Sequence, residues 1–80
     1  MTADEWQRRG DLLRRLRDAL EQRLADDALD YGEAIDDALR GSIESLPIEE
    51  ANRLLKSLRS TRRSLERVER WIIRHSSRRP

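Results

Sequence analysis

Apolar residues recur at every third or fourth position over most of this 80-residue chain, which is the period of a helix with one buried face. In the first part of the chain the stripe consists of Trp6, Leu13, Leu16, Leu20 and Leu24. The composition points the same way, because Leu and Ala make up most of the apolar residues, Phe is absent, and there are only three Gly and two Pro. The sequence therefore predicts an all-α fold.

A first helix is expected over residues 3–25. Thr2 and Glu5 have the spacing of a capping box, in which the hydroxyl accepts from the Glu5 amide and the carboxylate reaches back. Met1 and Trp6 occupy the two positions that form a hydrophobic staple around such a start. These signals place the beginning of the helix close to residue 3.

A second helix is expected over residues 31–45. Asp30 and Glu33 form another box-like start, and Gly41 either ends this helix in a left-handed cap or lies inside it. The apolar residues that continue the stripe here are Tyr31, Ile35, Ala38, Leu39 and Ile43. The alternative is that the first two helices are continuous.

A third helix is expected over residues 47–75, with Pro47 in its first turn and Glu49 and Glu50 where the helix dipole favours anions. Its apolar stripe consists of Ala51, Leu54, Leu55, Leu58, Leu65, Val68 and Ile72. Residues 76–80 are expected to be a frayed basic tail. The prediction is one domain, residues 1–75, folded as a small three-helix up-down-up bundle.

The apolar content also suggests self-association. Twenty-two large apolar residues must stabilise 80 residues without a disulfide, since the chain has no Cys, and a monomer of this kind is usually marginal. The third helix also extends beyond the second, which leaves part of its stripe uncovered. We therefore predict a homodimer that forms a larger helical bundle. The residues expected to pack its core or interface are Leu13, Leu16, Leu20, Leu58, Leu65, Val68 and Ile72.

The net charge of +1 conceals a strongly uneven distribution. Residues 1–17 have a net charge of +2, residues 18–50 of −9, and residues 51–80 of +8. In an antiparallel arrangement of two chains, the basic segment of one lies near the acidic segment of the other. Such pairing affects register and partner choice more than affinity, because exposed ion pairs contribute about 0–1 kcal/mol each.

One strip of the third helix is entirely basic and faces away from the apolar stripe. Trp71 lies at its edge, where an exposed indole could stack on a base or anchor a protein contact. Arginine at this density suits phosphate or protein partners, but such a strip can also be a solvated helix face that pairs with acids of the bundle. The residues of this arginine strip are Lys56, Arg59, Arg63, Arg67, Arg70 and Arg74.

Two features of the sequence resemble catalytic or metal-binding residues, and each has a simpler explanation. His75 is the only histidine and has no Cys or Ser–Asp partner set, so we expect a local role at a helix C-terminus. The segment Asp26–Asp30 matches an aspartate-rich magnesium motif, but this chain cannot enclose the diphosphate pocket that such chemistry needs. We expect these aspartates at a helix junction, and we expect no catalytic residues, metal or cofactor.

The function expected from the sequence is therefore non-enzymatic. The leading hypothesis is a small cytoplasmic regulator or adaptor, such as an inhibitor, that acts by protein–protein contact through the arginine strip and Trp71. The alternative is nucleic-acid binding through the same residues, and a third hypothesis is a purely structural assembly subunit. No apolar run approaches the length of a membrane span, and no membrane or small-molecule substrate is expected.

Overall fold

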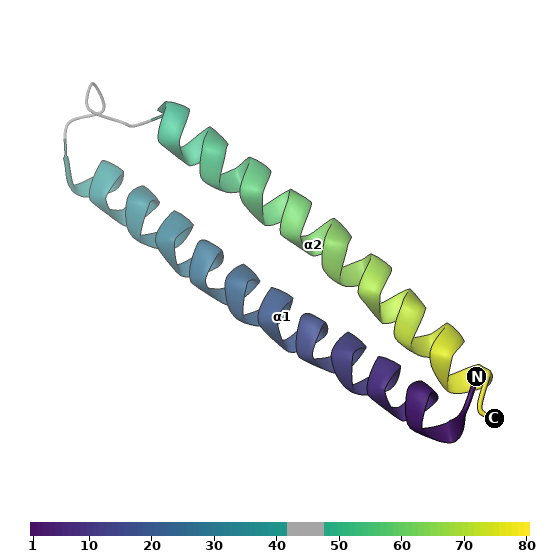
Figure 1. The fold of residues 1–80 in the computed structure, drawn as a ribbon. Helices are drawn as coiled ribbons and strands as arrows, with labels where there is room; N and C mark the ends of the chain where they lie inside the picture. Colours follow the sequence, from purple (N-terminus) through teal and green to yellow (C-terminus); the bar gives the residue numbers. More distant parts are fainter. Residues whose placement is uncertain (42–47) are drawn as a thin grey trace.

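The computed structural model describes residues 1–41 and 48–80, which form two long α-helices. Helix α1 spans Ala3–Arg40 and helix α2 spans Ile48–Ser77. Figure 1 shows the helices side by side and antiparallel, with the two chain ends together at one end of the hairpin. The Cα atoms extend over 60 × 14 × 13 Å, so the hairpin is rod-shaped.

The start of α1 is as predicted. Thr2 is extended, with φ −77° and ψ 162°, and its hydroxyl accepts a hydrogen bond of 3.2 Å from the Glu5 amide. At the other end Gly41 is the C-cap of α1 with extended backbone, φ −87°, so it neither adopts a left-handed cap nor lies inside the helix, the two alternatives that the sequence left open. Its amide donates to the Asp37 carbonyl oxygen at 3.0 Å and completes the last turn.

The prediction of three helices is wrong, because the expected first and second helices are one continuous helix. From residue 24 to residue 31 the half-buried side chains are Leu24, Asp27 and Tyr31, so the face of α1 that contacts α2 is continuous there. Gly32 weakens a helix by about 1 kcal/mol but does not interrupt its backbone hydrogen bonds. The box-like start at Asp30 is therefore an exposed position inside α1, and the up-down-up bundle is an up-down hairpin.

The helices contact each other along a narrow seam with alternating spacings of three and four residues. This average of about 3.5 residues is the repeat of a left-handed coiled coil, in which each helix meets a single neighbour. On α1 the seam consists of Trp6, Gly10, Leu13, Arg17, Leu20, Leu24, Asp27, Tyr31 and Ala34. On α2 it consists of Ala51, Leu54, Leu58, Thr61, Leu65, Val68, Ile72 and His75.

Burial along the seam is mostly partial. Of the residues predicted to pack in a core or interface, Val68 is buried, and Leu13, Leu20, Leu58, Leu65 and Ile72 are half-buried. Leu16 is 44% exposed, because it lies beside the seam and not in it. Large apolar side chains that remain exposed are Met1, Leu12, Leu16, Leu29, Leu39, Trp71 and Ile73.

The C-terminal helix extends to Ser77, two residues beyond the predicted end, and Glu49 and Glu50 lie in its first turn as predicted. The predicted roles of Pro47 and Ile43 concern residues outside the described part of the chain. Neither described helix combines the length and the apolar character that crossing a membrane requires.

Candidate functional site

At the open end of the hairpin, Trp6 of α1 and His75 of α2 hold the chain ends together. The Trp6 indole Nε1 donates to the His75 carbonyl oxygen at 3.0 Å, and His75 Nε2 donates to the Trp6 carbonyl oxygen at 2.7 Å. The two rings stack with centroids 4.5 Å apart and planes 13° apart. This reciprocal pair, the terminal clasp, joins residues 69 positions apart in the sequence.

Gly10 makes room for this clasp. A Cβ atom built on Gly10 lies 2.8 Å from His75 Cε1, closer than such contacts permit, so a side chain at this position displaces the imidazole ring. The clasp was not predicted from the sequence, where His75 had only a local role at the end of its helix. The available signal was the spacing of Trp6, Gly10 and Leu13, which places a glycine in the seam of an otherwise strong helix.

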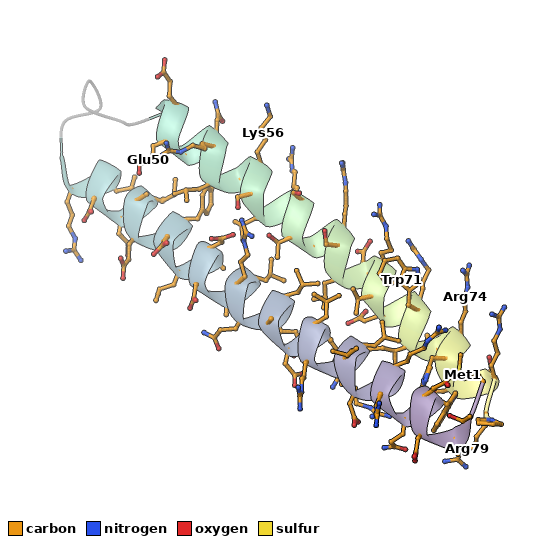
Figure 2. The ribbon with its side chains drawn as sticks, viewed as in Figure 1. Met1, Glu50, Lys56, Trp71, Arg74 and Arg79 are labelled. Atoms are coloured by element: carbon orange, nitrogen blue, oxygen red, sulfur yellow. The ribbon has the colours of Figure 1, made fainter. Side chains whose placement is uncertain are left out.

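The C-terminal tail also contacts the clasp. The Arg79 guanidinium carbon lies 5.7 Å from the centroid of the Trp6 ring, within the range of a cation–π contact. In Figure 2, Arg79 and Met1 lie together at this end of the hairpin. The segment 76–80, expected to be frayed, therefore contributes both the last residues of α2 and a contact to α1.

Next to the clasp is an open groove between the two helices, with a volume of about 660 Å³. Its apolar surface includes two side chains that remain well exposed, Leu12 at 63% and Trp71 at 43%. Trp71, predicted at the edge of the basic strip, is thus one wall of the groove. The residues that line this terminal groove are Met1, Trp6, Arg9, Leu12, Leu13, Trp71, Arg74, His75 and Arg78.

The charged residues of the terminal groove are all of one sign. Arg9 comes from α1, Arg74 from α2 and Arg78 from the tail, and all three are exposed. None of the nine lining residues is an acid. The groove therefore combines an apolar surface with a positive rim, which favours an apolar ligand that carries negative charge.

The arginine strip faces solvent as the sequence predicted. All six residues are exposed, and Figure 2 shows Lys56 and Arg74 on the side of α2 away from α1. None of the six forms an ion pair with another residue of the described ranges 1–41 and 48–80. Its neighbours Arg53 and Arg62 instead pair with Glu50 and Glu66 on the same helix. Arg74 belongs both to the strip and to the terminal groove.

The aspartate-rich segment was expected at a helix junction, but it lies in the middle of α1. Asp27 faces α2, where its carboxylate accepts a hydrogen bond of 2.9 Å from the Ser57 hydroxyl, and its side chain is only 19% exposed. Asp26 is exposed and accepts from Gln22 on its own helix. Within the described part of the chain, no three metal-ligating side chains converge on a common point.

The chemistry that the open end supports is binding, through apolar contact and positive charge. The His75 ring is held by the clasp, stacked on Trp6 and hydrogen-bonded to its carbonyl.

No family model, no curated protein and no solved structure matches this chain.

Proposed function

We propose that the protein is a non-enzymatic regulator or adaptor that binds another protein through its terminal groove. The observation that carries this proposal is the exposure of Leu12 and Trp71 on either side of an apolar groove whose charged residues are all arginines. Inhibition of the bound protein is one form that such regulation takes. A cytoplasmic location belongs to the same proposal.

The composition of the groove supports a protein partner. Trp and Arg are the residues most enriched among those that dominate interface energies, and exposed apolar side chains that cluster beside them are typical of interaction sites. The clasp supports the proposal because it fixes the relative position of the helices at this end, so the groove is formed before a partner arrives. Preorganisation of this kind lowers the cost of binding.

Photocrosslinking in cells tests the proposal. A photoreactive amino acid at Leu12 should form a covalent adduct with a protein, because this side chain faces the groove and is exposed. The matched control places the same amino acid at Leu29, which is equally exposed but lies in the acidic half of α1. Absence of a Leu12-specific protein adduct, or identical adducts at both positions, contradicts the proposal.

Nucleic-acid binding through the arginine strip is the second candidate. It is favoured by the six exposed cations, which extend over about 27 Å of helix and have no acidic partner within the described residues. Phosphate contacts of this kind release counterions, so the affinity should fall steeply between ~50 and ~200 mM salt.

Fluorescence anisotropy with labelled single- and double-stranded oligonucleotides tests this second candidate. Substitution of Arg63, Arg67 and Arg70 by Glu should weaken binding by more than about tenfold, since three phosphate contacts become repulsive. These three arginines do not line the terminal groove, so the triple variant should still bind a protein partner. Unchanged oligonucleotide affinity would remove the strip from consideration as a nucleic-acid site.

A further inference from the structure

We infer that the partner segment bound in the terminal groove is an acidic amphipathic α-helix of about three turns, supplied by another protein. This inference rests on the proposed function and specifies the chemistry of the partner. On binding, the segment becomes the third helix that the hairpin lacks at its open end.

The shape of the groove favours a helix over a small molecule. Small-molecule sites usually cover 70–90% of their ligand, but in the described part of the chain the groove is lined by two helices and the chain ends, with no third element to close over a ligand. A helix that lies along the groove supplies that wall itself. It contacts Leu12 on one side and Trp71 on the other, and removes both from water.

The size of the groove sets the length of the partner helix. From Trp6 to Leu13 the lining residues of α1 extend over about 10 Å, which is the distance from position i to position i+7 of a helix, and with a flanking residue or two at each end the partner segment has about three turns. The partner segment should therefore have large apolar residues at positions i, i+3 or i+4, and i+7, which is the usual pattern of a helix bound in a groove.

The charge of the groove selects the polar faces of that helix. Arg9 on α1 and Arg74 and Arg78 on α2 and the tail can reach the partner from both sides of the groove. Glu or Asp residues that flank the apolar stripe pair with them, whereas Lys or Arg at the same positions are repelled. Such rim pairs contribute about 0–1 kcal/mol each, so their main effect is selection between partners.

A second copy of this chain does not have the required pattern. If the grooves of two copies faced each other, their arginines would lie close together and repel, because no acid is among the lining residues. The acidic half of α1 exposes two large apolar side chains, Leu29 and Leu39. These lie ten residues apart, about 15 Å along the helix, and so do not have the spacing of three or four and seven residues that the groove requires.

The test uses three labelled peptides of about 15 residues, long enough to form helix on binding. The first has a leucine stripe flanked by glutamates, the second has lysine in place of each glutamate, and the third has alanine in place of each leucine. Anisotropy titrations with the whole protein should show saturable binding of the first peptide. The second and third should bind at least about tenfold more weakly, because one lacks the charge match and the other the apolar face.

Variants of the protein assign the binding to the groove. Leu12→Ala and Trp71→Ala should each lower the affinity for the acidic peptide by about tenfold, and Arg74→Glu should lower it by about fivefold. Arg70→Glu is the matched control, because it makes the same charge change on the same helix outside the groove, and its effect should stay within about twofold. All four positions are exposed, and circular dichroism verifies that each variant keeps its helices.

The inference is wrong if the acidic peptide does not bind, if the lysine peptide binds as well, or if Arg74→Glu and Arg70→Glu have the same effect. It is also wrong if a single-stranded oligonucleotide displaces the acidic peptide at lower concentration, or if a second copy occupies the groove in a dimer that Leu12→Ala disrupts. Failure with the peptides while position 12 still crosslinks to a protein rejects only the acidic helix. Failure of both experiments rejects the proposed function as well.

Discussion

Two glycines of α1 lie in opposite environments. Gly10 faces the His75 ring, where an added Cβ comes within 2.8 Å of Cε1, whereas Gly32 has no neighbouring atom within 4 Å of that position. Replacement of glycine by alanine should therefore have opposite effects on stability at the two positions. Gly32→Ala should stabilise the protein by about 1 kcal/mol, because alanine favours the helical backbone.

Gly10→Ala should instead destabilise the protein by about 1 kcal/mol, despite the same gain in helix propensity, because the imidazole must shift away from the added methyl group, which weakens its stack on Trp6 and its 2.7 Å hydrogen bond to the Trp6 carbonyl oxygen. Urea denaturation followed by circular dichroism measures both variants. Equal stabilities for Gly10→Ala and Gly32→Ala would show that the clasp does not contribute to folding.

At the scale of the helices, we expect a polar contact between α1 and α2, next to the middle of the seam, to stabilise their register. The Ser57 hydroxyl donates to Asp27 at 2.9 Å, with the Asp27 side chain largely covered. Asp27→Ala should therefore lower the free energy of unfolding by about 1 kcal/mol relative to Asp26→Ala, in which an exposed aspartate of the same helix is removed. Denaturant midpoints of the two variants provide the measurement, and equal midpoints would contradict a role for Asp27 in setting the register.

The helix positions were largely predictable, but their division into elements was not. Thr2 capped α1 as predicted, because a capping box involves only residues within one turn. The apparent second start at Asp30 and Glu33 was wrong, since Asp and Glu are equally common on the exposed face of a continuous helix. The deciding factor was the seam with α2, which continues across this segment at Asp27 and Tyr31.

The seam itself contains residues that hydrophobicity alone does not select. Gly10, Arg17 and Asp27 face α2, whereas Leu16, which was assigned to the packed stripe, lies outside it. A helix with one neighbour has room for only about two contacts per seven residues, so leucines beside the seam remain exposed. Which residues occupy those positions depends on how the second helix is aligned.

At the scale of the whole molecule, the hairpin leaves apolar side chains on more than one side. Homodimerisation, which the sequence predicted, would cover some of these side chains. Leu39 and Ile73 are the ones we expect in the dimer interface, because both are exposed and lie outside the terminal groove. Sedimentation equilibrium should then give a mass about twice the 9.5 kDa of one chain at micromolar concentration. The double variant Leu39→Glu and Ile73→Glu should reduce it to the monomer without altering the seam. A wild-type mass near that of one chain would contradict dimerisation.

Helical content, the start of α1 at Thr2 and the exposed basic face of α2 were deducible from the sequence, because each depends on residues within a few turns of one another. The terminal clasp and the groove beside it depend on residues from opposite ends of the chain, such as Trp6 and His75. Their contact depends on the length and alignment of two long helices, where a shift of one turn displaces partners by about 5.4 Å. Periodicity along one helix contains no information about that alignment, so only the folded hairpin brings these residues together.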